Sequence, residues 1–252
     1  MTGVHSAPPG YTRFETAGAD VVALSACADS VRQALVGGSL HSYAATHAAR
    51  RELHGRGKAY AVPLPDGSTR VVVRHSQHGG LLAPVTGDRF MAPTRAPHEL
   101  SVALQLAGAG VPTPDVVAYA TYPAWLGALR RADVETREIA GGRDLTAVLA
   151  SSSRPRDIST IIGAIVTLLR ALERAGARHP DLNLANVLIV GDSPEAFVID
   201  VDRVAFESPG AQVGAANVRR LLRSARKLRE LRRIEITDQE LSTLASVAGH
   251  AQ

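Results

Sequence analysis

Apolar and polar positions along the first half of the chain form short runs with the composition of β-strands. "KAYAVPL" (58–64) and "TRVVVRH" (69–75) are rich in β-branched residues, and the "PDG" between them is typical of a turn. We therefore expect a β-hairpin here, preceded by a turn that contains glycines. A proline-interrupted run at 111–120 and two short runs within 125–139 extend the pattern. Together these runs predict an antiparallel sheet in the N-terminal half.

Helical spacing of apolar residues dominates the second half. Residues 155–177 carry a long apolar stripe that ends near Gly176, which is typical of an amphipathic helix. Further on, "NVLIV" and "AFVID" are separated by "GDSPE" and predict a short hairpin. In the first half, by contrast, we expect an irregular start and only short helical pieces before the sheet. Helices are expected at 25–35, 39–53, 95–110, 143–152, 155–177, 215–231 and 237–249.

These patterns predict two lobes of different character. A mostly β lobe over 1–139 precedes a mostly helical lobe over 140–252, and the "AGG" at 140–142 joins them. The expected fold class is therefore α+β, and 252 residues suffice for two small lobes that share a cleft.

Composition narrows the setting in which such a protein works. No apolar run reaches the roughly 18 residues of a membrane span, and the first residues lack the apolar core of a signal peptide. The single cysteine, Cys27, cannot form an internal disulfide, is expected to be buried as a small hydrophobe, and fits a reducing compartment. We therefore expect a cytoplasmic protein.

Basic residues are numerous, and nearly all of them are arginine. The net charge is +4, and of 28 basic residues only Lys58 and Lys227 are lysine, so chemistry that normally uses a lysine has two candidates or uses an arginine. Eight basic residues fall within 217–233, and a surface formed by them would attract phosphates. The alternative is a solvated basic helix face whose leucines pack inward. Few aromatic residues and no nucleic-acid-binding module argue against nucleic acid. We expect a peripheral contact with the anionic inner face of the cytoplasmic membrane.

Three polar side chains surround the predicted C-terminal hairpin. "RHPDLNLANVLIV" places Asp181 and Asn186 before the first strand, and "AFVID" places Asp200 after the second. Asn186 and Asp200 stand at the two ends of the hairpin sequence, so their side chains can meet and hold Mg²⁺, which prefers oxygen ligands. Asp181 can face the same cleft without being a ligand and can orient a hydroxyl. Phosphoryl transfer requires this division of tasks, with a metal at the phosphates and a carboxylate at the attacking hydroxyl.

A turn-forming role is the simple alternative, because Asp and Asn often cap backbone groups in turns. The whole pattern, His-x-Asp-Leu-Asn-x-x-Asn followed by two apolar strands and Ile-Asp, is far more specific than any one of its residues. "HPDLNLANVLI" and "VIDVDR" resemble the catalytic and metal loops of the protein-kinase-like fold. With "HGRGKAYAV", "VVVRHSQHGGL" and "NVRRLLRSARKL", they resemble the 3-deoxy-D-manno-octulosonic acid (Kdo) kinases over about residues 39–233.

The resemblance implies a two-lobed kinase that uses ATP and Mg²⁺ and phosphorylates the Kdo sugar of a lipid A precursor. In such an enzyme Asp181 is the catalytic base or hydroxyl-orienting acid, and Asn186 and Asp200 hold the metal. Gly55 and Gly57 would let a turn close over the phosphates, because glycine permits near approach of backbone N–H groups.

The strand lysine that kinases use against the phosphates is missing here. Arg74 stands on the second strand instead, with Glu99 as the expected helix partner, and Lys58 lies in the glycine turn. Either Arg74 or Lys58 can contact the phosphates, since a guanidinium is always charged and binds phosphate through a fork. The alternative interpretation is a solvated Glu99 and an edge-strand charge at Arg74.

Adenine would lie against "ETREIAGG", with Thr136 at the gate and the backbones of Arg137 and Ile139 facing the base. His179 is expected to brace the catalytic loop by hydrogen bonds. Further candidates are Asp202 and Arg203, which flank Asp200 and either support the metal loop or form a surface ion pair, and His75 and His78, which could face the acceptor.

Other functions fit parts of this pattern. The same chemistry could act on a heptose, an aminoglycoside-like molecule or a protein side chain, although the motif around Asp181 argues against ordinary protein kinases. A nucleotide-binding pseudokinase scaffold would keep the fold without catalysis; loss of the strand lysine favours it, and retention of Asp181, Asn186 and Asp200 opposes it. An RNA-binding regulator would use the basic segment alone, with steeply salt-dependent affinity.

Overall fold

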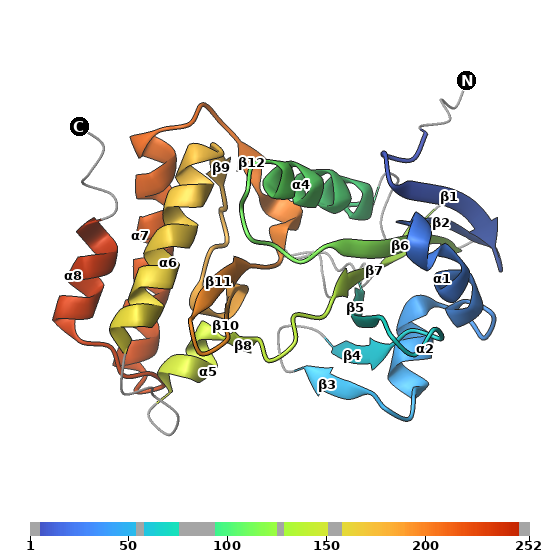
Figure 1. The fold of residues 1–252 in the computed structure, drawn as a ribbon, viewed down its shortest axis with the longest axis horizontal. Helices are drawn as coiled ribbons and strands as arrows, with labels where there is room; N and C mark the ends of the chain where they lie inside the picture. Colours follow the sequence, from blue (N-terminus) through green and yellow to red (C-terminus); the bar gives the residue numbers. More distant parts are fainter. Residues whose placement is uncertain (1–5, 54–57, 76–93, 125–128, 151–157, 247–252) are drawn as a thin grey trace. The chain divides into compact units, whose positions relative to one another are not determined.

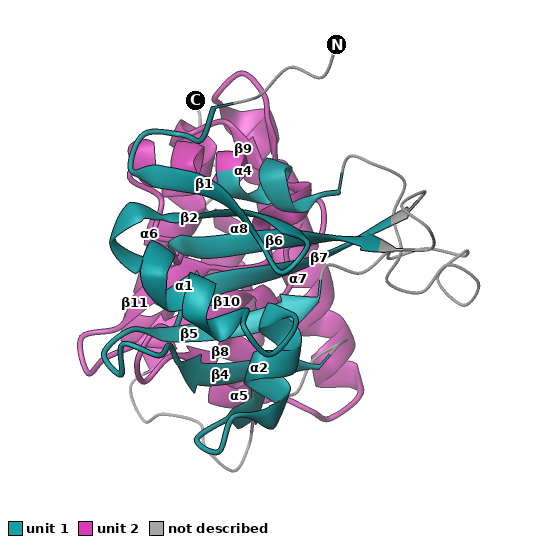
Figure 2. Cartoon of the chain, turned by 90° about the vertical axis from the view of Figure 1, so that its right-hand side faces the viewer, with its two compact units in different colours: residues 1–100, 115–138 teal, residues 101–114, 139–252 magenta. Residues whose placement is uncertain are grey.

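The computed structural model describes residues 6–53, 58–75, 94–124, 129–150 and 158–246, whose elements are labelled in Figure 1. The chain divides into two compact units (Figure 2). Unit 1 comprises residues 1–100 and 115–138, and unit 2 comprises residues 101–114 and 139–252. Among the described residues, the large sheet lies in unit 1 and most helical residues lie in unit 2, so the predicted α+β class is confirmed.

Unit 1 is built on a seven-stranded antiparallel sheet with the order β1-β2-β6-β7-β5-β4-β3. The predicted hairpin over 58–75 is present as β4 and β5, which pair from Ala59 opposite Arg74 to Pro63 opposite Arg70. The strands are β1 Tyr11–Thr16, β2 Ala19–Leu24, β3 Arg51–Leu53, β4 Ala59–Pro63, β5 Arg70–His75, β6 Val116–Ala124 and β7 Leu129–Arg137.

The N-terminal region departs from the prediction in three places. The expected irregular start is a hairpin of β1 and β2, closed by a turn in which Ala17 and Gly18 both have positive φ. The helix expected to run through residue 53 ends earlier, and β3 pairs with β4 instead. The two strand-like runs expected within 125–139 are one strand, β7, in the part of that range that the structure describes.

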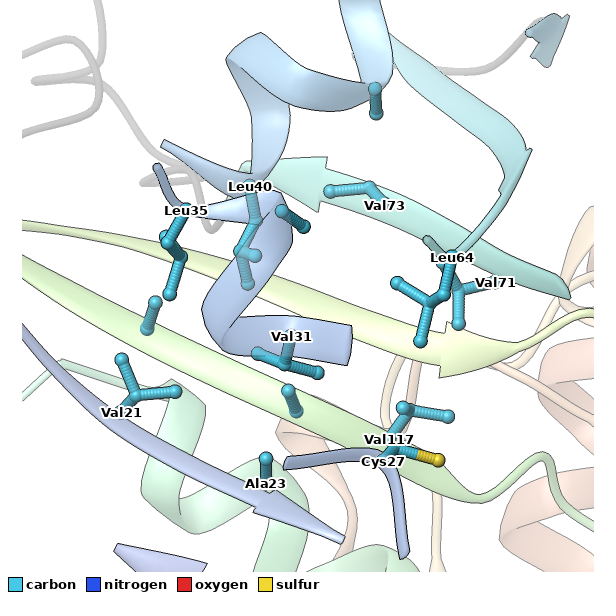
Figure 3. Close-up of a cluster of buried hydrophobic side chains, with 14 of the residues drawn as sticks. Val21, Ala23, Cys27, Val31, Leu35, Leu40, Leu64, Val71, Val73 and Val117 are labelled. Atoms are coloured by element: carbon cyan, nitrogen blue, oxygen red, sulfur yellow. The ribbon is translucent and has the colours of Figure 1, made fainter. Parts of the chain in front are cut away.

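Two short helices cover one face of this sheet. α1 (Ala28–Ala34) and α2 (Leu40–Thr46) follow the β1–β2 hairpin, and Ser39 caps α2 by accepting a hydrogen bond from the Ser42 N–H at 3.0 Å. Figure 3 shows the apolar side chains that these helices and the sheet bury together. Cys27 lies in this core as a buried free thiol, as expected.

Unit 2 packs its helices around two small antiparallel sheets, with the orders β11-β10-β8 and β12-β9. The predicted hairpin is present as β10 and β11, and the long amphipathic helix is α6, which contacts α7, α8 and β11 (Figure 1). The elements are β8 Arg143–Asp144, α5 Leu145–Leu149, α6 Ile158–Arg174, β9 Ala177–Arg178, β10 Val187–Val190, β11 Glu195–Val198, β12 Ala205–Phe206, α7 Ala211–Glu230 and α8 Asp238–Ser246.

The predicted helix over 95–110 is α4 (Ala96–Gly108), whose first residues, through Leu100, belong to unit 1. The segment after it joins unit 2 because Val198 of β11 takes part in two hydrogen bonds with it. The Val198 N–H donates to the Pro112 carbonyl at 2.9 Å, and the Thr113 hydroxyl donates to the Val198 carbonyl at 3.0 Å. None of the helices in the described ranges combines the length and the apolar character that crossing a membrane requires.

Candidate active site

A buried histidine organises the loop that carries Asp181. The His179 N–H donates to Asn217 Oδ1 at 2.9 Å, and Asn217, which is buried on α7, donates to the Ala177 carbonyl at 2.8 Å. On the ring, Nδ1 accepts the Asp181 N–H at 3.3 Å, and Nε2 lies 3.4 Å from the Ile199 carbonyl. Burial lowers the pKa of His179, which favours the neutral ring. Because Nδ1 accepts the Asp181 N–H, the proton of the neutral ring is on Nε2. The expected bracing by hydrogen bonds is therefore present.

Two arginines grip the carboxylate of Asp181. Arg203 donates from Nη1 to Oδ2 at 2.5 Å, and Arg220 donates from Nη2 to Oδ1 at 3.1 Å. Partial burial by itself would raise the pKa of Asp181, but the hydrogen bond and charge of Arg203, with the charge of Arg220, lower that pKa below its ordinary value. The carboxylate is therefore ionised at neutral pH and can accept a hydrogen bond from a hydroxyl.

The two predicted metal ligands lie at the open end of the β10–β11 hairpin. Val187 pairs with Val198, so the two ends of the hairpin sequence come together beyond that pair, and the Ile199 N–H donates to the Asn186 carbonyl at 3.0 Å. Asn186 Nδ2 donates to the Asp181 carbonyl at 3.1 Å, which leaves Oδ1 as the other end of its amide. Asp200 follows with a left-handed backbone (φ 61°, ψ 51°) and begins the turn that carries Arg203.

This set of donors suits Mg²⁺. One amide oxygen and one carboxylate are hard oxygen ligands, and Mg²⁺ usually takes one or two carboxylates and completes its octahedron with substrate phosphates and water. Within the described ranges no group of three or more His, Cys, Asp or Glu side chains is placed to hold a metal. A metal at this hairpin would therefore depend on the nucleotide for further ligands.

In unit 1, the structure joins Arg74 to Glu99. Arg74 Nη2 donates to Glu99 Oε1 at 2.5 Å, and Glu99 is buried in the first turn of α4. Thr136 pairs with Val72, two residues before Arg74, so Thr136, Val72 and Arg74 share one face of the sheet. Lys58 is exposed just before β4. Arg74 and Thr136 thus lie on the same face of the sheet, and Lys58 lies beside β4. The phosphate and gate roles of these residues stay predictions.

Two backbone groups of the expected hinge already make hydrogen bonds within the protein. The Arg137 N–H donates to the Asp115 carbonyl at 2.8 Å, and the Ile139 carbonyl accepts the Gly142 N–H at 3.0 Å. Gly55, Gly57 and His78 lie outside the described residues.

His75 belongs to a polar cluster that the sequence did not reveal. Its Nδ1 lies 2.5 Å from Asp133 Oδ1, and its ring stacks on His41 of α2 with 3.7 Å between centroids. Because neighbouring residues of a strand point to opposite faces, His75 faces α2 and not the side of Arg74. Glu135, two residues after Asp133, is fully buried, and both its carboxylate oxygens are without a hydrogen-bond partner among the described residues.

Arg220 and Asn217 are the site residues that sequence reasoning missed. They are three residues apart on α7, within a segment interpreted only as a basic surface. The sequence held no signal that separates Arg220 from the arginines beside it, because only the packing of α7 shows which of them reaches Asp181.

Comparisons with known proteins point to one family. Residues 41–247 match the lipopolysaccharide kinase (Kdo/WaaP) family. A 3-deoxy-D-manno-octulosonic acid kinase of Haemophilus influenzae (strain PittGG) is 30% identical over 201 residues, which cover 76% of this chain and 81% of that protein. The protein of that name from Vibrio vulnificus (strain YJ016) is 31% identical over 195 residues, covering 75% and 78%.

Among solved structures, "WaaP in complex with acyl carrier protein" superposes with a TM-score of 0.53. It is 16% identical in sequence, and the match covers 88% of this chain and 86% of that one. This likeness confirms the predicted protein-kinase-like fold.

Proposed function

Because the chain belongs to the lipopolysaccharide kinase (Kdo/WaaP) family, and is thus a phosphotransferase that acts on a hydroxyl group, we propose that it phosphorylates the Kdo sugar of a lipid A precursor with ATP. The observation that carries the proposal is the joint arrangement of Asp181, Asn186 and Asp200 around one hairpin, in a chain about 30% identical to Kdo kinases over three quarters of its length. The lipid-linked acceptor and the γ-phosphate of ATP as donor are part of the proposal.

Asp181 serves the acceptor. Its ionised carboxylate accepts the hydrogen bond of the attacking hydroxyl, orients its oxygen towards the γ-phosphorus, and takes up the proton as the new oxygen–phosphorus bond forms. The bond between the γ-phosphorus and the bridging oxygen breaks in the same displacement, and ADP leaves with the electron pair. Because His179, Asn183 and Asn186 all make hydrogen bonds to the Asp181 backbone, the carboxylate is held in place before the acceptor arrives.

Asn186 Oδ1 and the Asp200 carboxylate would hold Mg²⁺ at the other side of the reaction. When bound, the metal supplies positive charge that neutralises the phosphates of the nucleotide. Arg74, held by buried Glu99, is suited to grip the nucleotide phosphates, because its guanidinium stays charged and its planar shape matches a phosphate. Lys58 is the second candidate for this contact.

The basic segment 217–233 suits an anionic membrane surface. Leu221 and Leu222 are buried, so most of the apolar side of α7 packs inward, whereas Leu231 is 54% exposed. The exposed basic residues are Arg219, Arg223, Arg226, Lys227, Arg232 and Arg233. We propose that this surface attracts the inner leaflet and brings the enzyme to its glycolipid acceptor, with affinity that falls as salt rises.

The test is mass spectrometry of a Kdo-bearing lipid A precursor after incubation with the protein, ATP and Mg²⁺. The expected product gains one phosphate, and Asp181→Ala abolishes the gain. Asp192→Ala, which removes an exposed carboxylate from the β10–β11 turn, is the matched control and should leave the yield unchanged. If Mg-ATP binds but the precursor gains no phosphate, the Kdo assignment is wrong, and heptose and aminoglycoside acceptors are tested next. If no hydroxyl acceptor is phosphorylated, the pseudokinase scaffold replaces it.

A further inference from the structure

Two histidine rings stack on each other between α2 and the sheet of unit 1. His41 lies in the first turn of α2, and His75 is the last residue of β5. Their rings are 3.7 Å apart between centroids, with 19° between the ring planes. Because α2 packs over β4, β5 and β7, the stacked pair is part of the contact that holds this helix on the sheet.

One buried carboxylate contacts both histidines. Oδ1 of Asp133, on β7, lies 2.5 Å from His75 Nδ1, and Oδ2 accepts the backbone N–H of His41 at 2.9 Å. The neighbouring N–H of Leu40 donates to the hydroxyl of Tyr122, on β6, at 2.9 Å. The first turn of α2 is thus tied to the sheet by its backbone, and the same carboxylate also holds the ring on which His41 stacks.

The stacked pair accommodates a proton on His75 but not a second one on His41. A charged His75 ring is paired with Asp133, whose Oδ1 lies beside its Nδ1. In the described part of the chain the His41 ring makes no ion pair, and its Nε2 is buried without a hydrogen-bond partner. Two charged rings 3.7 Å apart and partly removed from water would repel each other. The stack is therefore stable with at most one added proton.

The groups around His41 together favour its neutral ring. Burial, and next the charge of His75, lower the pKa of His41 below its ordinary value. The charge of Asp133 and a contact with the Lys58 backbone raise that pKa by less, and the charge of Lys58 lowers it again. The ring of the docked helix is therefore neutral at neutral pH.

The other ionisable groups around the pair supply no negative charge that would stabilise a second proton. Glu135 of β7 is protonated at acidic pH, because burial raises its pKa to about 8. Tyrosine side chains are neutral below about pH 10; Tyr60 stands edge-on to the ring from α2 with 5.3 Å between centroids, and burial raises the pKa of Tyr122. On α1, which also packs against α2, Asp29 and Arg32 are exposed and pair with each other.

We propose that His41 and His75 form a proton-sensitive latch that holds α2 on the sheet of unit 1. With at most one added proton, the two rings stack and the helix stays docked. When both rings are charged, their repulsion frees the helix, and water then solvates the His41 ring. This device involves neither the nucleotide nor the acceptor, so its test does not depend on the proposed function.

Acid is expected to open the latch. The docked His41 has a pKa below the ordinary 6.5, so between that lowered pKa and pH 6.5 the released helix binds a proton that the docked helix does not. Docking is therefore complete above pH 6.5 and weakens as pH falls below it. One proton taken up per opening raises the fraction of open molecules at most about tenfold per pH unit.

Hydrogen–deuterium exchange of the full chain between pH 7.5 and pH 5.5, followed by mass spectrometry, measures the latch directly. It is carried out on Glu135→Gln, because Glu135 would release a proton on opening and mask the uptake by His41. Protection of α2 peptides, corrected for the intrinsic pH dependence of exchange, should fall about three- to tenfold, while protection of β6 peptides stays constant. Constant protection of α2 would overturn the latch, and so would an equal loss in β6, because the whole sheet would then be opening.

Two variants in the same background assign the effect to the stacked pair. His41→Phe keeps a ring for the stack but cannot take up a proton, so the protection of α2 should no longer depend on pH; a fall that persists refutes the latch. His98→Gln removes an exposed histidine of α4 in unit 1 and should leave the fall unchanged. If His41→Phe does not fold, NMR titration of the His41 ring in Glu135→Gln decides. A midpoint below pH 6.5 supports the latch, and a midpoint at or above 6.5 overturns it.

Discussion

Glu135 makes the stability of unit 1 depend on pH, and Glu135→Gln should reveal how strongly. The carboxyl group is completely buried on β7, and neither oxygen has a hydrogen-bond partner among the described residues. Burial, with a smaller contribution from the charge of Asp133, raises the pKa of Glu135 from 4.5 to about 8. The side chain is therefore protonated in the folded protein at neutral pH.

The sign and size of the effect follow from proton binding. Between pH 4.5 and 8 the folded protein holds a proton at Glu135 that the unfolded chain has released, so stability falls as pH rises through this window and levels off above it. Each unit of pKa difference corresponds to about 1.4 kcal/mol, so the contribution lost between pH 5 and pH 9 is on the order of 4 kcal/mol. A glutamine has the shape of the protonated acid and cannot ionise. Wild type and Glu135→Gln should thus be similar near pH 5, and the variant should be much the more stable at pH 9.

Urea unfolding followed by circular dichroism from pH 5 to pH 9 measures this difference. Glu52→Gln, which removes an exposed carboxylate from β3 in the same unit, serves as the control and should leave the pH profile unchanged. Parallel profiles for wild type and Glu135→Gln would refute the argument, because they would mean that Glu135 is ionised in the folded protein as it is in the unfolded chain.

Three further predictions concern the backbone, the nucleotide and the metal. Gly176→Ala should destabilise the protein by on the order of 3 kcal/mol, because Gly176 has φ +65° and a Cβ there would lie 2.1 Å from the Glu207 carbonyl oxygen. Thermal melting measures this loss. Gly163→Ala is the control, because a Cβ at Gly163 meets no other atom within 4 Å, and it should stabilise the protein by about 0.5–1 kcal/mol. Arg74→Ala should weaken Mg-ATP binding, measured by calorimetry, at least about tenfold. Arg70→Ala removes an exposed arginine of the same strand and should leave the affinity for Mg-ATP unchanged. Equal losses of affinity in the two variants would contradict a contact between Arg74 and the phosphates. Chelation by EDTA should stop phosphate transfer and Mg²⁺ should restore it, and full transfer in EDTA would exclude the metal role of Asn186 and Asp200.

The C-terminal elements were predictable because their signals are local. Ile161, Ile165, Leu168 and Leu172 recur at spacings of four, three and four, and all of them are buried along α6. The β10–β11 hairpin consists of two apolar runs separated by a short polar turn, and its residues pair in a simple antiparallel register. When the apolar residues that become buried all lie in one helix or one hairpin, the element can be predicted without knowing which distant segments pack against it.

The N-terminal errors have the opposite cause. β1 is a sheet edge with mostly exposed or half-buried residues, so its sequence shows no clean alternation, and its partner β2 stands next to β6, far along the chain. β3 is another edge, three residues long, and only its pairing with β4 makes it a strand. Strand propensity depends on neighbours in the sheet more than helix propensity does on its surroundings. The sequence of β1 was therefore interpreted as an irregular start, and that of β3 as the end of a helix over the alanine-rich residues 39–53.

In the candidate site, too, residues with a local sequence signal could be predicted, and a residue brought in by packing could not. Asp181, Asn186 and Asp200 could be proposed from the sequence because one loop and one hairpin carry them within 20 residues, and the pairing of β10 with β11 brings the last two together. Arg220 lies 39 residues from Asp181 in sequence, and only the packing of α7 brings it to the carboxylate. No spacing rule distinguishes it from the arginines beside it.

The structure resolves this ambiguity by the faces of α7. Asn217, Arg220 and Ser224 follow one another at spacings of three and four, and all three contact the loop that carries Asp181. Asn217 accepts the His179 N–H, Arg220 pairs with Asp181, and Ser224 Oγ accepts the Leu184 N–H at 3.3 Å. Arg219 and Arg223 lie on exposed positions of the same helix. A run that looks uniformly basic in sequence therefore forms two surfaces, one of which holds the loop with Asp181 and the other of which faces solvent.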